Sequence, residues 1–101
     1  MNSDKPVLTI SMAAHLLGLH PRTLMLYENT GLIKPYRTNT QRRLFSIRDL
    51  DRLQFVKFLT QQNGVNLAGV KVLFEAFILA EKGGIDLQKG LFPEFQPVAL
   101  L

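Results

Sequence analysis

The chain of 101 residues contains no cysteine, and this absence excludes several classes of function. Disulfide bonds, thiolate metal sites and iron–sulfur clusters all need cysteine sulfur. The two histidines, His15 and His20, lack the acidic or thiol companions that a metal site needs. We therefore expect neither a metal nor another cofactor.

Long apolar runs and catalytic motifs are also missing. No uninterrupted apolar stretch is long enough to span a bilayer. The first residues, MNSDKPV, are polar and lack the apolar core of a signal peptide, so we expect a cytoplasmic protein with no membrane contact. Paired carboxylates, a nucleophile beside a base and a phosphate-cradling loop are not found either. The sequence therefore gives no support for an enzyme.

The charge that is present is unevenly distributed. The formal net charge is +4, and 47% of residues are hydrophobic, as in a small globular domain. Residues 1–64 hold nine Lys/Arg against four Asp/Glu, whereas residues 65–101 hold three against four. A basic front and a near-neutral back favour a half that faces DNA and a half that faces a partner.

Residues 11–31 have the pattern of two short helices joined by a tight turn. Apolar residues recur at helical spacing up to Gly18, which breaks the first helix, and Pro21 suits the first position of a second. Two helices joined by so short a turn cross steeply, and the second projects. Its inner side should carry Leu24 and Glu28, with Tyr27 at the edge. Its outer side should carry Arg22, Met25, Leu26 and Asn29. On this spacing alone, an ordinary helical hairpin is an equal alternative.

A basic hairpin follows and favours DNA binding. One strand should end near Arg37, residues 38–41 form a polar turn, and residues 42–45 return as the second strand. Arg37, Arg42 and Arg43 then lie around the tip of the turn. A solvated hairpin does not need three arginines, but one that lies along phosphates does.

Three separated blocks carry a resemblance to a known family. HPRTLMLYENTGLIKP, then RRLFS and then GVNLAGVK resemble the MerR family of bacterial transcription regulators, and within it the heat-shock repressor (HspR-type) subgroup, over roughly residues 8–80. The resemblance implies a winged helix-turn-helix that binds DNA as a homodimer. By position, His20, Arg22, Thr23 and Tyr27 match the recognition helix, and Arg43 matches the wing arginine. Many relatives sense metals or oxidants through cysteine, which this chain cannot do.

Three departures from the family pattern concern the DNA contacts. Met25 stands where relatives usually have arginine, and Leu26 where they often have tyrosine. Gln41 and Arg42 stand where the wing often has glycine and tyrosine. One basic group is thus lost from the helix while one is added on the wing.

Two further helices are expected. Ser46 and Asp49 resemble a capping box for a central helix that runs to about Gln62. Asn66 is a good N-cap for a helix over residues 67–82, after a turn that the resemblance makes a second, smaller wing. This last helix has a wide apolar stripe, expected in the core, formed by Leu67, Val70, Leu73, Phe74, Phe77 and Ile78. A narrower stripe of Val72, Ala76 and Leu79 is either scattered exposed residues or a subunit contact.

Residues 83–101 form an apolar tail. MerR-type proteins usually continue with a long helix that forms a coiled coil between subunits, but Gly90, Pro93 and Pro97 forbid one here, and heptad spacing is absent. The tail should either fold back on the core or bind a partner. We therefore expect a DNA-binding domain over residues 1–82 and a short tail without a coiled coil over residues 83–101.

These patterns predict a mainly α fold, a winged helix-turn-helix of four helices with a small two-stranded antiparallel wing. The predicted function is a sequence-specific, double-stranded-DNA-binding transcription regulator and repressor on inverted-repeat operators, weakly dimeric alone and firmly dimeric on DNA. The predicted DNA contacts are His20, Arg22, Thr23, Met25, Leu26, Tyr27, Arg37, Arg42 and Arg43. The predicted dimer or partner contacts are Val72, Ala76, Leu79, Leu91, Phe92 and Phe95. The alternative is an adaptor that binds another protein through its apolar helices and tail.

Overall fold

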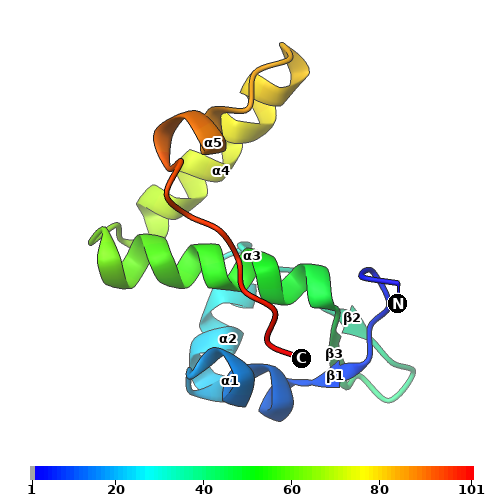
Figure 1. Ribbon diagram of the computed structural model, residues 1–101. Coiled ribbons are helices and arrows are strands. Elements are labelled where there is room, and N and C mark those ends of the chain that lie inside the picture. The colour runs from blue at the N-terminus through cyan, green and yellow to red at the C-terminus, as the bar shows by residue number, and fades with distance from the viewer. Residues whose placement is uncertain (1) are drawn as a thin grey trace.

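A computed structural model describes residues 2–101 and shows a mainly α protein with a small sheet (Figure 1). The helices are α1 (Ile10–Leu17), α2 (Pro21–Asn29), α3 (Ile47–Lys57), α4 (Leu67–Lys82) and α5 (Leu87–Leu91), and a π-helical segment, η1 (Phe58–Gln62), continues α3. The strands are β1 (Leu8–Thr9), β2 (Tyr36–Arg37) and β3 (Arg43–Phe45). The predicted fold class, a mainly α winged helix-turn-helix, is confirmed.

The sheet has three antiparallel strands in the order β1-β3-β2. The predicted two-stranded wing is the β2–β3 hairpin, and β1 adds a strand to its inner edge by pairing Leu8 with Phe45. Leu8 and Phe45 are both buried, so this pairing fastens the base of the hairpin to the core. The wing tip therefore projects from an anchored base.

The helix boundaries follow local chemistry. Gly18 ends α1 with a left-handed φ of 67°, and Pro21 occupies the first turn of α2. Ser46 Oγ accepts from the backbone N–H of Asp49 while the Asp49 carboxylate accepts from that of Ser46, so the predicted capping box is present. The Asn66 side chain caps α4 by accepting from Gly69 N–H at 2.8 Å.

The core surrounds α3, which lies between the helix-turn-helix and α4 (Figure 1). Leu53, Val56 and Leu59 along this segment are fully buried. Leu24 from α2 and Leu32 after it are also buried, so the second helix of the motif is fixed to the same core. Each buried leucine side chain contributes roughly 1.5–3 kcal/mol to the stability of the fold. Because several such side chains of the motif and of α3 share one core, α3 is the main support of the motif.

The helix α4 projects from the body as an arm (Figure 1). It ends at Lys82, as predicted. The tail contains a fifth helix that was not predicted, α5, which Asp86 caps by accepting a hydrogen bond from Lys89 N–H. Ile78 was expected in the core but is 54% exposed, because it lies on the part of α4 beyond the body. After α5 the chain returns across α3 towards α1 (Figure 1). Within residues 2–101, none of the helices has the length and apolar character needed to cross a membrane.

Candidate nucleic-acid interface

The outer face of α2 is open to solvent, as the helical spacing predicted. Arg22, Leu26 and Asn29 are exposed, with Leu26 at 50%, and Met25 is half-buried beside them. Tyr27 corrects the prediction: it was expected at the edge of the helix and among the DNA contacts, but it is only 4% exposed. It lies three residues after Leu24 and so shares the core-facing side of the helix.

The start of α2 is held by His20. Its Nδ1 atom accepts a hydrogen bond from Arg22 N–H at 3.0 Å, and its carbonyl accepts from Thr23 N–H. His20 is thus the N-cap of α2. Thr23 is half-buried in the first turn. Because Pro21 has no N–H and those of Arg22 and Thr23 are bonded to His20, the first turn of α2 is capped from within the chain.

Two of the wing arginines have partners that the sequence did not indicate. Arg37 and Arg43 are direct partners across the β2–β3 pair, so their side chains lie on one face of the hairpin. Both reach Glu28 of α2: Arg43 Nε donates at 2.6 Å and Arg37 donates from a guanidinium nitrogen at 3.2 Å. Of the three arginines predicted around the tip of the turn, two therefore brace the hairpin against α2. Arg42 lies between them and the turn and is exposed.

Glu28 is the acceptor in this brace, and its environment keeps it charged. Its side chain is 17% exposed. Burial by itself would raise the pKa of Glu28, but the hydrogen bond and positive charge of Arg43, supported by Arg37, lower the pKa below its ordinary value. The sequence placed Glu28 on the inner side of the helix but did not reveal its partners.

The tip of the wing contains a strained residue. Gln41 has a φ of 65°, the left-handed region that favours glycine. The Thr38 hydroxyl accepts from Arg42 N–H, and the Gln41 carbonyl accepts from the Arg37 guanidinium at 2.9 Å. These bonds hold the turn closed. The resemblance described above implies glycine here, and glycine is the residue that this backbone conformation prefers.

Two basic side chains of α3 donate hydrogen bonds to backbone carbonyls at the ends of the two helices of the motif. Lys57 Nζ donates to the carbonyl of Leu17, at the end of α1, at 2.7 Å. Arg52 Nε donates to the carbonyl of Leu32, just after α2, also at 2.7 Å. Such charge-assisted bonds to backbone carbonyls are stronger than neutral ones, and they link α3 to both helices of the motif.

The Arg52 guanidinium also lies 4.3 Å from the centre of the Phe74 ring, so it connects the motif with α4. Burial lowers the pKa of Arg52, and the charge of Asp49 partly opposes this shift. The sequence gives no sign of these contacts of Arg52 and Lys57. Their partners lie 20 and 40 residues away, and no local pattern indicates them.

The predicted partner contacts divide into two groups. Val72 and Leu79 are exposed at 63% and 69%, Leu91 is exposed at 51%, and Ala76 is half-buried. Phe92 and Phe95 instead pack within the chain. Their ring centres lie 5.7 Å and 5.0 Å from that of Phe55. Of the two outcomes expected for the tail, the structure shows the one in which it folds back on the core.

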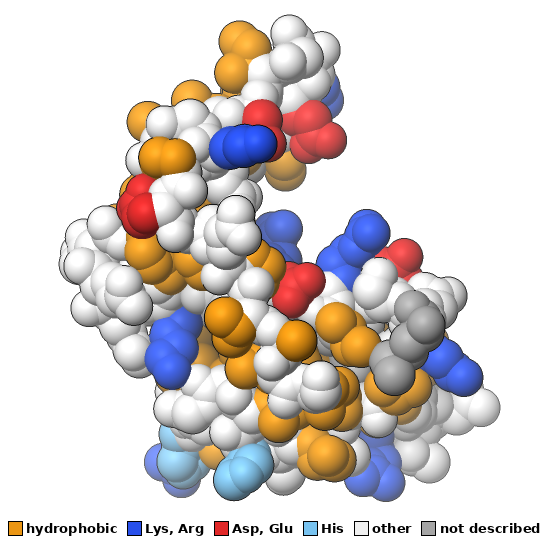
Figure 2. Space-filling view, viewed as in Figure 1, with side chains coloured by type: hydrophobic (Ala, Val, Ile, Leu, Met, Phe, Trp, Pro, Cys, Tyr) orange, Lys and Arg blue, Asp and Glu red, His pale blue; other side chains and the backbone are white. Residues whose placement is uncertain are grey.

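The lower edge of the molecule, below α1 and α2, carries Lys, Arg and His side chains and no acidic ones in the view of Figure 2. Acidic side chains gather instead on the arm and at mid-height (Figure 2). Among residues 2–101, no group of three or more His, Cys, Asp or Glu side chains could hold a metal ion. The arrangement is that of a basic, partly apolar surface with a projecting helix and hairpin.

Comparisons with known proteins agree with this geometry. The family described as MerR HTH family regulatory protein matches residues 8–76. The "Putative heat shock protein HspR" of Streptomyces coelicolor is 47% identical over 75 residues, which cover 74% of this chain and 50% of that protein. The "HTH-type transcriptional regulator GlnR" of Bacillus anthracis is 41% identical over 66 residues, covering 65% of this chain and 50% of that protein. The chain thus spans about half the length of these curated relatives.

A solved structure is similar over most of the chain. It is the crystal structure of HiNmlR, described as a MerR family regulator lacking the sensor domain, bound to promoter DNA. The TM-score is 0.70 at 28% sequence identity, and the match covers 85% of this chain and 64% of that one.

Proposed function

This chain belongs to the MerR family of helix-turn-helix regulatory proteins, and from this we propose that it binds double-stranded DNA sequence-specifically and represses transcription. The structural neighbour bound to promoter DNA supports the choice of ligand. The resemblance to the heat-shock repressor subgroup supports repression rather than activation. The DNA-binding unit of this proposal is residues 1–82.

The observation that carries the proposal is the pairing of α2 with the wing through Glu28. The exposed face of α2 has the dimensions that the major groove of B-DNA admits. The brace from Glu28 to Arg37 and Arg43 sets the position of the hairpin relative to that helix. A helix in the groove and a wing tip along the adjacent backbone then bind as one rigid unit.

Each side chain of this surface suits a different part of the duplex. Arg22 can donate to a guanine edge, and the apolar side chains of Met25 and Leu26 suit thymine methyl groups. Arg42, at the wing tip, suits a phosphate. His20 and Thr23, at the start of α2, lie where a helix N-terminus would meet the backbone. We assign Arg37 and Arg43 to positioning the wing, with their charge adding to the basic field.

A single unit of this kind has a small footprint, so the proposed operator is an inverted repeat read by two copies. The symmetry of a dimer is mirrored in its site, and linking two half-site contacts raises affinity through effective concentration.

Selection of bound sequences from a random duplex library tests the proposal. We expect an enriched site containing two inverted half-sites and binding that weakens steeply with salt. Enrichment of no sequence, with equal affinity for all duplexes, would contradict sequence-specific regulation.

The exposed apolar side chains of the arm favour a second candidate, a protein-interaction adaptor. Val72, Ile78, Leu79 and Ile85 are each at least 54% exposed. An adaptor would show no salt-dependent binding to any duplex, so the same experiment separates the two functions.

A further inference from the structure

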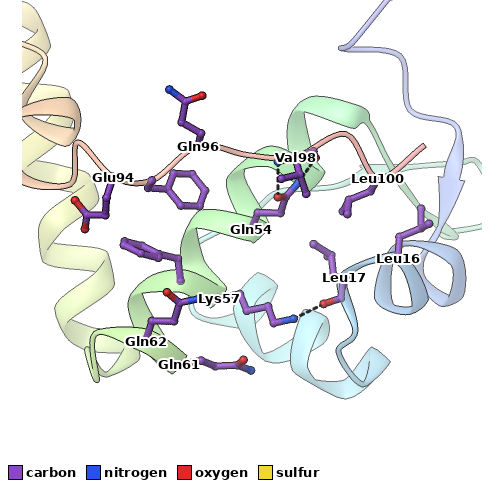
Figure 3. A pocket seen from close by; sticks show the side chains of 12 residues that line it. Leu16, Leu17, Gln54, Lys57, Gln61, Gln62, Glu94, Gln96, Val98 and Leu100 are labelled. Carbon is purple, nitrogen blue, oxygen red and sulfur yellow. Dashed lines mark hydrogen bonds between the residues drawn. The ribbon is translucent and has the colours of Figure 1, made fainter.

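From here on, the tail means residues 85–101, the part of the C-terminal segment that follows the two glycines. Two hydrogen bonds between Gln54 and Val98, together called the clasp, hold it on α3. The Gln54 side chain donates to the carbonyl of Val98 and accepts from its N–H, both at 2.9 Å (Figure 3). One side-chain amide thus satisfies both backbone groups of one residue, as a neighbouring strand would. This contact recognises extended backbone, whatever side chain residue 98 carries.

Two phenylalanines anchor the tail before the clasp. Phe92 and Phe95 pack on Phe55, and their ring centres lie 5.9 Å and 5.1 Å from that of Phe58. Aromatic contacts of this kind supply most of the energy of a docked segment. The clasp and the two anchors together define a groove along α3 that is complementary to this tail.

Within one chain the groove is incompletely filled. A pocket of about 460 Å³ remains beside the tail, between α1 and α3, with Leu16, Leu17 and Leu100 among its lining residues (Figure 3). Val98 and Leu101 of the tail are each 62% exposed. Val98 and Leu101 therefore lie at the surface, whereas Phe92, Phe95 and Leu100 of the same segment pack against the core.

The chain reverses direction sharply between α4 and the tail. Only Gly83 and Gly84 separate Lys82 from the tail, and Gly84 has a φ of 80°. The turn is closed by Ile85 N–H, which donates to the carbonyl of Ala80. A short hinge with a demanding backbone conformation is the kind at which identical chains exchange segments.

We propose that the groove along α3 also accepts the tail of a second copy, so that two chains pair by reciprocal exchange of residues 85–101. Every contact of the tail re-forms between chains, because the groove and tail are identical in both. Ile78 and Leu79 of α4 and Ile85 of the tail are exposed near the glycines, so they are free to pack between the two chains of the proposed pair. The inference rests on the dimer of the proposed function, but its test needs no DNA, so the two can fail separately.

The first test changes the hinge. Gly84→Val introduces no clash, because nothing lies within 4 Å of the added Cβ, but it strains the closed turn at positive φ. In each chain, the closed conformation, with the tail on its own α3, should become about tenfold less favourable relative to the open one. The dimerisation constant should then rise about a hundredfold, because two hinges open in each dimer. Sedimentation over a dilution series measures this. Gly64→Val is the matched control, because Gly64 has a φ of 63°, is equally uncrowded and lies outside the hinge.

The second test detects exchange directly. The chain has no cysteine, so single cysteines can be introduced without background. Gln61→Cys and Gln96→Cys place one thiol on the groove and one on the tail, both at the same pocket. Mixing these two variants in the Gly84→Val background with a short bismaleimide should give a covalent two-chain product. Gln61→Cys mixed with Asn39→Cys, on the wing tip, is the control.

Two outcomes would overturn the proposal. One is a Gly84→Val protein that stays monomeric, or that dimerises no more than Gly64→Val. The other is a dimer in which the mixed variants give no more two-chain product than the control, because its tails would then remain on their own chains.

Discussion

At the residue scale, one carboxylate holds the recognition helix and the wing together. Glu28 accepts from both Arg37 and Arg43, which lie on the face of the hairpin that meets α2. The two arginines are thereby oriented before any DNA is bound. Arg42, which points to solvent, is the side chain of the wing best placed to meet a phosphate.

We expect Glu28→Gln to destabilise the protein at neutral pH by about 1–3 kcal/mol, because a charged acceptor is lost from two hydrogen bonds. The pKa of Glu28 is lowered on folding, so its stabilisation is present above its ordinary value of 4.5 and is lost as the pH falls through the folded pKa. Urea unfolding at pH 7 and at acidic pH should therefore show a difference between the two proteins that shrinks with acid. Glu75→Gln, at an exposed site on α4, is the control. A difference independent of pH would show that the charge of Glu28 is not what stabilises the brace.

Arg42→Ala and Arg43→Ala should differ in their effect on DNA binding. Losing one phosphate contact reduces the slope of log affinity against log salt by about one unit, and we expect this for Arg42→Ala. Arg43→Ala should weaken binding and protein stability together, with a smaller change of slope, because Glu28 loses its closest partner. Affinities measured over a salt series, with Lys71→Ala on α4 as the control, test this. Equal slope changes for the two arginine variants would count against the separation of roles.

At the element scale, one residue at the tip of the β2–β3 hairpin has an unfavourable backbone conformation. Its base is fastened by β1 and by buried Phe45, but its turn places Gln41 at positive φ. A residue other than glycine loses roughly 1–2 kcal/mol of stability in this conformation. Glycine avoids that cost but loses more conformational entropy on folding. The wing is thus rigid at its base and strained at its tip.

Gln41→Gly should raise the free energy of unfolding by up to about 1 kcal/mol, because relief of strain exceeds the entropy that glycine loses. The urea midpoint should rise without a change in the slope of unfolding free energy against denaturant. Asn39→Gly, in the same turn but without positive φ, should lower stability slightly. A Gln41→Gly protein less stable than the parent would mean that the Gln41 side chain contributes more than its backbone costs.

At the scale of the whole molecule, the helix-turn-helix and the arm are joined through α3. Arg52 and Lys57 extend from α3 to backbone carbonyls of the motif, and Phe55 meets Phe74 of α4 and the tail phenylalanines. Packed rings and hydrogen bonds thus connect the tail, through α3, to the helix-turn-helix. The two-fold assembly expected on an operator would join two such bodies.

We expect the protein to be a weak dimer alone and a firm dimer on an inverted repeat. Each copy contacts one half-site, so a duplex with two half-sites should bind two copies cooperatively. Sedimentation with a full repeat and with a half-site duplex measures the stoichiometry. One copy per duplex at saturation, with no preference for the repeat, would contradict the proposed operator.

Local sequence patterns determined where most of the helices begin and end. The glycine break, Pro21 and the apolar spacing placed α1 and α2, the capping box placed the start of α3, and the three blocks of resemblance indicated the family. The tertiary structure alone decided which groups meet over long separations. Glu28 and Arg43 are 15 residues apart, Lys57 and Leu17 are 40, and Gln54 and Val98 are 44. The physical reason is direction: helical spacing places Leu24 and Glu28 on one side of α2, but strand register and the packing of α3 decide what each side of a helix meets. Arg43 therefore pairs with a carboxylate, Tyr27 lies in the core, and the tail phenylalanines pack on Phe55.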